Sequence, residues 1–338
     1  MNYSKSTPIT IADIAETLGL SKSTVSRVLS GTGRIGAETR KRVLEYAKEC
    51  GYKPNLIAKG LAVSKTFNIG VVIPGDAVQT DMPYFQTCLA GITEYASSQN
   101  YDVLLTMANG NTVEGVERIL NNRKVDGIIL TRLLENDVRV NLIRSSNVPF
   151  VVVGSSPDSE IFQVDTDNEK ACKDFMNVLV AKQKKRFVFL CGSQDILVNR
   201  SRLSGFLSAM NEKNIDKSDY VIFKNISSNL GVFEKLDSLD AVQNTCIICG
   251  DDVLCSSALD WLQRKGLKIP FDVEIASFYN SSLLNQYMPA ISAVNINAHK
   301  IGSKSCELLL NVIKGIECST KNVVEHEFLF RDSTHIWV

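Results

Sequence analysis

Apolar and polar positions alternate in a regular way over most of the chain, from residue 68 onward. Short apolar runs follow one another, and amphipathic stretches with helical spacing separate them. The seven runs are IGVVIP (69–74), YDVLLT (101–106), VDGIIL (125–130), PFVVVG (149–154), RFVFLC (186–191), TCIIC (245–249) and VEIASF (273–278). Since this alternation is typical of βαβ units, it predicts parallel sheets with helices on both faces. We expect two such sheets.

The first 30 residues contain two short stretches with helical spacing. Thr10 and Asp13 can cap a helix that begins at residue 11, and Gly19 would end it. Ser21 can cap a second helix over 22–29, whose apolar positions share one face. Two short helices joined by a three-residue turn predict a helix-turn-helix, in which the N-terminal residues of the second helix enter the major groove of DNA.

A third helix is expected from about residue 37 to residue 50, with Gly51 as its stop signal. Val43, Leu44 and Ala47 are expected to face inward. The helical spacing alone fits a plain three-helix bundle as well as it fits a DNA-binding unit.

The formal net charge of zero conceals two segments of opposite charge. Residues 1–66 carry eleven Lys and Arg against five Asp and Glu, which leaves 26 bases and 32 acids for the rest of the chain. A basic segment ahead of an acidic body is the electrostatic pattern of a phosphate-binding module joined to a domain with another task.

Several motifs, in order and spacing, resemble the LacI/GalR family of bacterial repressors. Over about the first 75 residues they are TIADIAETLGLSKSTVSRVLSG, ETRKRV, GYKPNLIAKGLA and IGVVIP. Further along they are VDTDNEKA (164–171), NRSRLSGF (199–206), which matches an arginine-bearing loop before a helix, GDDVLCSSAL (250–259) and MPAISAVN (288–295). The resemblance therefore extends to about residue 315.

This resemblance implies a small all-α helix-turn-helix domain and an α/β body like that of periplasmic binding proteins, with two doubly wound parallel-sheet subdomains. The expected divisions are a DNA-binding domain over 1–53, a hinge helix and linker over 54–66, and an effector-binding and dimerisation domain over 67–338. Crossovers between the two subdomains are expected near residues 164, 291 and 323.

The resemblance also assigns DNA contacts in the second helix. Lys22 and Ser23 occupy its base-reading positions, with Arg27 beside them, and Thr24 or Ser26 would bind phosphate. The DNA-binding set also includes the two cap residues, Thr10 and Ser21.

In the family, the segment PNLIAKGLA corresponds to a hinge helix that orders on DNA. Asn55 would cap it, Ala58 would pack against the minor groove, and Leu61 would act as an apolar wedge between base pairs. Lys59 is included in the same DNA-binding set. A plain linker helix, with Leu61 in a core contact, is the alternative for this segment.

For the effector pocket, the resemblance nominates Tyr84, Phe85, Arg200, Asp251 and Tyr279. These positions follow the carboxyl ends of predicted strands, where open α/β sheets bind ligands. Any one of them could instead be a surface or structural residue.

Two further residues bear on the effector's charge. Arg202 could brace Asp251 or Asp252. Relatives that bind neutral sugars usually carry Asp where this chain has Tyr279, and losing that acid while keeping the arginines favours an anionic effector such as a sugar acid.

The expected function is a cytoplasmic, dimeric repressor that binds double-stranded operator DNA and responds to a small sugar or sugar-acid effector. A sugar-binding protein of the same fold, catalytic or not, is the alternative. An exported receptor would need a signal peptide, which MNYSKSTPIT does not provide, and no apolar run is long enough to span a membrane. An enzyme would need a phosphate loop or catalytic motif, and SGTGR (30–34) lies between predicted helices rather than after a strand.

No cofactor and no metal is expected. The nine cysteines are scattered and are expected to be reduced thiols. Cys246 and Cys249 have metal-ligand spacing, but they lie in an apolar run typical of a buried strand, so we expect them in the core.

Overall fold

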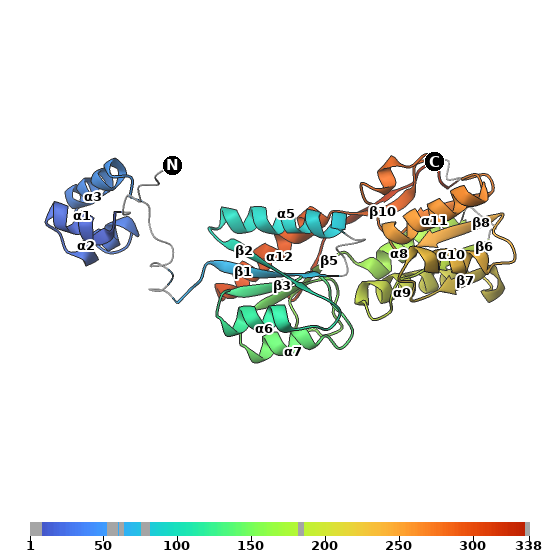
Figure 1. The fold of residues 1–338 in the computed structure, drawn as a ribbon, viewed down its shortest axis with the longest axis horizontal. Helices are drawn as coiled ribbons and strands as arrows, with labels where there is room; N and C mark the ends of the chain where they lie inside the picture. Colours follow the sequence, from blue (N-terminus) through green and yellow to red (C-terminus); the bar gives the residue numbers. More distant parts are fainter. Residues whose placement is uncertain (1–8, 53–59, 61–63, 76–81, 182–185, 335–338) are drawn as a thin grey trace, which may run out of the picture. The chain divides into compact units, whose positions relative to one another are not determined.

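The computed structural model describes residues 9–52, 60, 64–75, 82–181 and 186–334. The chain divides into two compact units, Met1–Thr66 and Phe67–Val338 (Figure 1). We call the first the helical unit and the second the body.

In its described residues, the helical unit contains the helices α1 (Ile11–Leu18), α2 (Lys22–Leu29) and α3 (Ala37–Glu49). Thr10 and Asp13 cap α1 reciprocally, since the Thr10 backbone N–H donates to the Asp13 carboxylate over 2.8 Å and the Asp13 N–H donates to the Thr10 hydroxyl. Gly19 ends α1 in the left-handed conformation, with a φ of 64°.

The core of the helical unit is small, and one expected member is absent from it. Ile14, Val25, Val28 and Val43 are fully or almost fully buried. Leu44, which was expected to face inward, is 47% exposed. Val43 and Ala47 are four residues apart and share the buried face of α3, whereas Leu44 is turned about 100° away from Val43 around the helix axis.

The body contains two six-stranded sheets, which define two lobes. The sheet of lobe 1 has the order β11-β5-β4-β3-β1-β2, and that of lobe 2 has the order β12-β10-β9-β8-β6-β7. The strands of lobe 1 are β1 (Asn68–Pro74), β2 (Asp102–Ala108), β3 (Gly127–Leu130), β4 (Phe150–Val153), β5 (Gln163–Asp165) and β11 (Lys321–Val323). Those of lobe 2 are β6 (Arg186–Leu190), β7 (Tyr220–Phe223), β8 (Thr245–Cys249), β9 (Val273–Ser277), β10 (Ser292–Ile296) and β12 (His326–Leu329).

Helices cover both faces of each sheet (Figure 1). Lobe 1 has α5 (Met82–Ser98) and α12 (Ala298–Ile313) on one face and α6 (Glu114–Asn121) and α7 (Val138–Ser145) on the other. Lobe 2 has α8 (Asn168–Ala181) and α9 (Leu197–Glu212) on one face and α10 (Asn229–Asp237) and α11 (Asp252–Lys265) on the other. Two short 3₁₀ helices, Lys217–Asp219 and Leu284–Gln286, also belong to lobe 2.

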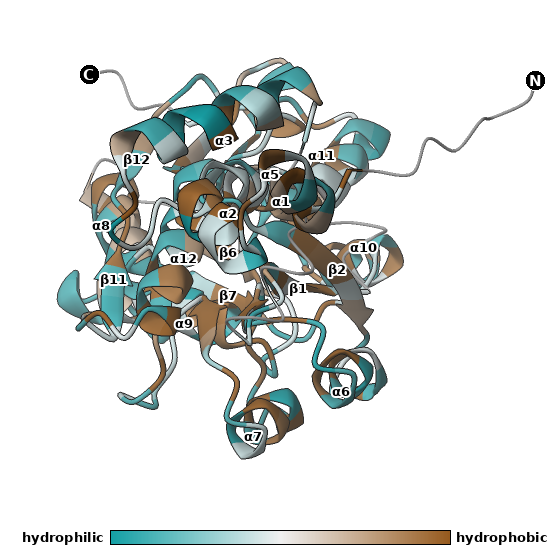
Figure 2. Cartoon of the chain, turned by 90° about the vertical axis from the view of Figure 1, so that its left-hand side faces the viewer, coloured by the Kyte–Doolittle hydropathy of each residue, from teal (hydrophilic) through white to brown (hydrophobic). Residues whose placement is uncertain are grey.

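The expected fold class is confirmed, because all seven predicted apolar runs form strands of two mostly parallel sheets. Alternate residues of one strand face opposite layers. Val71 packs toward α5 and α12, whereas Val72 packs toward α6 and α7. In Figure 2, α6 and α7 each show a hydrophobic side and a hydrophilic side, as surface helices over a sheet require.

The chain passes between the lobes three times. It leaves lobe 1 after β5, returns between β10 and α12, and leaves again between β11 and β12. β12 then pairs antiparallel with β10, whereas the other strand pairs are parallel. These crossings bring the carboxyl ends of strands from both sheets to the region between the lobes.

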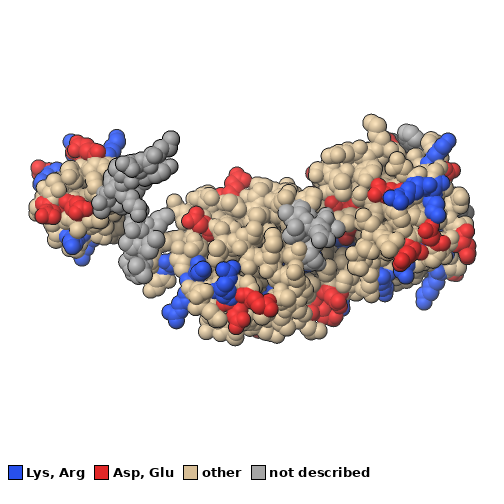
Figure 3. All heavy atoms as spheres, in the orientation of Figure 1, with Lys and Arg blue, Asp and Glu red and all other residues tan. Residues whose placement is uncertain are grey.

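Cys246 and Cys249 are fully buried in β8. Within the described ranges, no three His, Cys, Asp or Glu side chains are grouped so as to hold a metal ion. None of the helices in the described part of the chain is long and apolar enough to cross a membrane. On the face of the body visible in Figure 3, acidic and basic side chains are interspersed.

Candidate functional site

The second helix of the helical unit presents a polar surface without acidic residues. Val25 and Val28 anchor α2 in the core, and the side chains at Lys22, Ser23, Ser26 and Arg27 are exposed. These four residues form two pairs spaced four apart, so each pair lies along one side of the helix. The arrangement suits contact with the phosphates and base edges of DNA.

Ser21 holds the start of α2 in place. Its hydroxyl accepts a hydrogen bond from the Thr24 backbone N–H over 3.1 Å and lies 2.8 Å from the Thr24 hydroxyl and 2.9 Å from the Ser23 hydroxyl. The cap fixes the first turn, which is the turn that carries Lys22 and Ser23.

The hinge residues Asn55, Ala58, Lys59 and Leu61 lie outside the described residues.

A cavity of about 600 Å³ lies in the body, lined from both lobes. From lobe 1 come residues at or after the carboxyl ends of β1, β2, β3, β4 and β5, and from lobe 2 those after β6, β7, β8 and β9. A site at the carboxyl ends of parallel strands is where this class of sheet binds small molecules, and the volume suits a ligand of a few hundred daltons.

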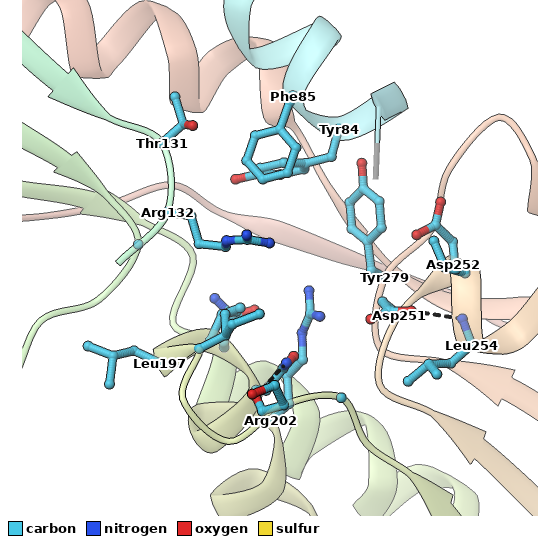
Figure 4. Close-up of a pocket in the computed structure, with 18 of the residues that line it drawn as sticks. Tyr84, Phe85, Thr131, Arg132, Leu197, Arg202, Asp251, Asp252, Leu254 and Tyr279 are labelled. Atoms are coloured by element: carbon cyan, nitrogen blue, oxygen red, sulfur yellow. Dashed lines mark hydrogen bonds between the residues drawn. The ribbon is translucent and has the colours of Figure 1, made fainter. Parts of the chain in front are cut away.

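Three aromatic rings form one wall of the cavity (Figure 4). The Tyr84 ring lies 5.2 Å from the Phe85 ring and 5.4 Å from the Tyr279 ring, both nearly edge to face. Tyr84 lies in the first turn of α5 in lobe 1 and Tyr279 follows β9 in lobe 2, so this contact joins the two lobes. Burial raises the pKa of the Tyr84 hydroxyl well above its usual value, which keeps it a neutral hydrogen-bonding group.

Two guanidinium groups point into the same central space, Arg132 from the loop after β3 and Arg202 from α9 (Figure 4). Arg202 is only 8% exposed, and its Nε has no hydrogen-bond partner among the described residues. A buried donor without an acceptor is costly, and a ligand that supplies an acceptor removes that cost.

Three carboxyl groups also line the cavity. Burial raises the pKa of Asp165 to about 6, although hydrogen bonds from Ser155 and Asn168 act in the opposite direction. Burial likewise raises the pKa of Asp252 to about 6. The Asp251 carboxylate caps α11 by accepting from the Leu254 N–H over 2.9 Å. Each carboxyl group therefore already has a protein partner or a weakened tendency to ionise.

Four of the five nominated pocket residues line this cavity: Tyr84, Phe85, Asp251 and Tyr279. Arg200 does not line it, and Arg202 does. Sequence reasoning placed both arginines in a loop before a helix, but residues 197–212 form α9. Two residues along a helix correspond to a rotation of about 200°, so the two side chains point in nearly opposite directions, and Arg202 faces the cavity whereas Arg200 does not.

Arg132 and Asp165 were not anticipated from the sequence. Arg132 follows the predicted run VDGIIL directly, and this position at a strand's carboxyl end was the available signal. Asp165 belongs to a motif interpreted only as a crossover. Its approach to the cavity depends on pairing of β5 with both β4 and β11, which lies far along the chain.

Comparison with known proteins identifies the family. The model for bacterial regulatory proteins of the lacI family matches residues 10–55, and the model for a periplasmic binding protein-like domain matches residues 176–334. Catabolite control protein A of Priestia megaterium is 30% identical over 336 residues, covering 96% of this chain and 99% of that protein. The chain belongs to the LacI family. It is a DNA-binding transcriptional regulator.

Other members of the LacI family are also similar to this chain over most of its length. The HTH-type transcriptional regulator MalR of Streptococcus pneumoniae is 29% identical over 317 residues, covering 90% of this chain and 93% of the relative. The structure of the lac repressor dimer bound to operator and the anti-inducer ONPF matches with a TM-score of 0.81 at 22% identity, over 97% of this chain and 99% of that one. At this identity, the structural match speaks for the fold.

Proposed function

We propose that this LacI-family chain is a homodimeric repressor of carbohydrate catabolism genes, and that a sugar-type effector in the interlobe cavity controls its affinity for operator DNA. The observation that carries the proposal is the cavity itself, lined by both lobes and furnished with an aromatic wall and a buried guanidinium group. Aromatic faces pack against the apolar faces of sugar rings, and charged or polar groups fix the orientation of a ligand.

On the DNA side, α2 enters the major groove, where Lys22 and Ser23 contact bases, Arg27 lies beside them, and Thr24 or Ser26 binds phosphate. The cap residues Thr10 and Ser21 lie at the N-termini of α1 and α2, where backbone N–H groups favour an anion. Residues 54–66 act as the hinge between the domains at 1–53 and 67–338, with Leu61 as the wedge.

The dimer is proposed because one recognition helix reads too few base pairs to specify an operator, and a paired half-site supplies the rest. The lac repressor structure described above is a dimer on operator. Leu230, Phe271 and Met288 are large apolar side chains that are exposed on lobe 2, as an uncovered interface would leave them.

The effector class is proposed from its relatives and from charge. A CelR regulator has been solved in complex with cellobiose, and a related structure is described as a probable maltose operon repressor. Among the residues that the structure describes, the Arg202 Nε has no acceptor, and Tyr279 brings no carboxylate to the cavity. A sugar acid supplies a carboxylate for the guanidinium group, so we place sugar acids ahead of neutral sugars.

The proposal contains no catalytic step and no cofactor or metal. The regulator acts where the bacterial chromosome is, in the cytoplasm. A sugar bound by the protein should be recovered chemically unchanged, and turnover of the bound sugar would contradict the proposal.

Thermal denaturation against matched sugars tests the effector class. Glucose and glucuronate form one pair, galactose and galacturonate another. A compound at 100 times its dissociation constant adds about 2.7 kcal/mol to the stability of the protein. We expect the sugar acids to stabilise the wild type and Arg202→Gln to abolish this stabilisation. The control Arg144→Gln changes an exposed arginine that pairs with Asp158 in lobe 1, and it should retain the stabilisation. Stabilisation by neutral sugars alone would refute the sugar-acid class.

Selection of bound sequences from a random DNA library tests the regulator. We expect an enriched near-palindrome, and a stabilising compound should change the affinity for it. Binding without any enriched sequence would contradict operator recognition.

A further inference from the structure

Two loops, one from each lobe, pair with each other at the rim of the cavity. The loop after β3 in lobe 1 contains residues 133–135, and the segment that leads into α9 in lobe 2 contains residues 195–197. The Glu135 N–H donates to the Asp195 carbonyl oxygen over 2.8 Å, and the Leu197 N–H donates to the Leu133 carbonyl oxygen over 3.2 Å. Between them, Leu134 and Ile196 form an antiparallel β-bridge.

Side chains reinforce the same junction. Both terminal nitrogens of the Arg200 guanidinium group donate to the two oxygens of the Glu135 carboxylate. The Arg200 Nε donates to the Gln194 carbonyl oxygen, which fixes the guanidinium plane from within lobe 2. The hydrogen bonds from Arg200 hold the pKa of Glu135 below its usual value. Leu197 of lobe 2 also packs against the apolar cluster of lobe 1.

The lobe 1 half of the junction is held rigid by a buried ion pair. The Asp137 and Arg139 side chains are 1% and 3% exposed, and the Arg139 Nε donates to the Asp137 carboxylate over 2.7 Å. Asp137 also accepts from the Leu134 N–H, and the Arg139 Nη2 donates to the Arg132 carbonyl oxygen. The loop is therefore shaped before it meets lobe 2, so pairing costs little additional ordering.

We propose that residues 133–135 and 195–197, together with the Glu135–Arg200 ion pair, form an interlobe latch that holds the two lobes closed over the cavity. Neither Glu135 nor Arg200 lines the cavity, whereas Leu133 and Leu197 from the two paired segments do. The latch therefore controls effector affinity by setting the fraction of molecules in which the lobes are closed. Its charged side chains do not contact the effector. The control of effector affinity depends on the proposed effector function, whereas the closure of the lobes by the latch does not.

The latch adds non-covalent contacts between the lobes to the three chain crossings. The three crossings are covalent and persist in any open form. The latch is non-covalent, and its ion pair is partly exposed, with Arg200 and Glu135 side chains at 41% and 42%. A contact of this kind can break without unfolding either lobe, as an opening and closing element must.

Hydrogen exchange of the full chain, read by mass spectrometry, tests the latch directly. The Glu135 and Leu197 amides donate across the lobes, so opening exposes both. We expect Glu135→Lys and Arg200→Glu each to speed the exchange of these two amides about tenfold, and the milder Glu135→Gln about threefold. The double variant Glu135→Arg with Arg200→Glu, which restores the ion pair in reverse, should restore their protection. Peptides from β1 and β8 should keep their protection in every variant, since the lobes stay folded.

An ion pair of similar exposure within one lobe is the matched control. Lys173 and Glu212 join α8 to α9 over 2.7 Å, with side chains 37% and 45% exposed. Glu212→Lys should leave the exchange of both latch amides unchanged. Unchanged exchange in all three single latch variants would overturn the proposal, and so would a double swap as fast as the single variants. Loss of protection in β1 and β8 as well, with Glu135→Gln, would also overturn it.

A second measurement, of thermal stability with sugars, tests the latch and the effector function separately. Each variant is melted with the sugar pairs named above, and a working latch predicts that the singles need about five to ten times more of a stabilising sugar. If no sugar stabilises any variant while the exchange results hold, the effector proposal fails and the latch stands. If sugars stabilise all variants equally, the latch does not control affinity.

Discussion

At the scale of single residues, Asp165 is a carboxyl group whose buried environment opposes its ionisation. It is buried at the end of β5, and burial raises its pKa to about 6 despite two side-chain donors. An acid whose pKa is higher in the folded state than in the unfolded state takes up its proton more readily when folded. Stability attributable to this group is therefore lost as pH rises from about 4 through about 6.

Asp165→Asn should remove that loss. A shift from 3.8 to about 6 corresponds to about 3 kcal/mol, so the free energy of unfolding of the wild type should fall by that order, relative to the variant, between pH 4 and pH 7.5. Denaturant unfolding at a series of pH values measures it. Asp158→Asn, at a partly exposed position, is the control: it keeps Asp165, so its free energy of unfolding should fall over this pH range as that of the wild type does. Parallel curves for wild type and Asp165→Asn would show that Asp165 does not titrate in this range.

The two arginines show what could be predicted at this scale and what could not. The sequence nominated Arg200 for the cavity, but Arg202 from the same segment lines it instead. Choosing between Arg200 and Arg202 required knowing that α9 begins at Leu197, and helix starts are poorly defined where no side chain caps them. The partner of Arg200, Glu135, lies 65 residues away, and only the folded arrangement of the two lobes brings it there.

At the scale of secondary-structure elements, six of the seven predicted strands are largely apolar runs buried in the interior. The seventh, β2, is an edge strand with Leu105 43% and Met107 51% exposed, and its apolar sequence was enough to identify it. The strands that were not identified as such include β5 and β11, which have three residues each, and β7, which is only half-buried. Such short strands carry too little periodicity to be recognised, and long-range pairing determines them.

The packing of α5 against α12 predicts how Gly302→Ala changes stability. Helix propensity and a steric clash change it in opposite directions, so the sign of the change shows which effect is larger. A Cβ at Gly302 would lie 2.0 Å from the Cys88 carbonyl oxygen, and one at Gly91 would lie 2.1 Å from the His299 carbonyl oxygen. Helix propensity alone favours Gly302→Ala by up to about 1 kcal/mol. The clash with backbone should outweigh this and destabilise lobe 1 by about 2 to 3 kcal/mol.

Chemical denaturation of Gly302→Ala measures that change. Lys304→Ala, at an exposed position of the same helix, serves as the control and should stay within about 0.5 kcal/mol of wild type. A more stable Gly302→Ala variant would mean that the two helices can separate at no cost.

The cap of α2 provides an element-scale prediction for the helical unit. Ser21→Ala removes the acceptor for the Thr24 N–H and should destabilise this unit by about 1 kcal/mol. Ser21→Asn keeps a capping oxygen and should retain most of the stability. The melting transition of the helical unit, followed by circular dichroism, measures both, and equal losses in the two variants would assign Ser21 a role other than capping.

At the scale of the whole molecule, the helical unit and the body carry opposite net charge, so attraction to DNA belongs to the helical unit alone. A dimer presents two such units to one duplex. If it neutralises about eight phosphates, the logarithm of its affinity should fall with the logarithm of salt concentration at a slope near −7, whereas a monomer that neutralises about four should give a slope near −3.5. The slope thus reports how many helical units contact the DNA.

Fluorescence anisotropy on a selected operator duplex, from 50 to 300 mM potassium chloride, measures the slope. A scrambled duplex of equal length is the control, and we expect weaker binding to it with a slope of similar size, because phosphates and not bases release counterions. A slope near −3.5 on the operator would contradict the dimer.

Leu61→Ala should leave the slope nearly unchanged while lowering operator affinity more than scrambled-duplex affinity, because an apolar wedge acts only where the DNA bends. Equal losses on both duplexes would remove Leu61 from the hinge role.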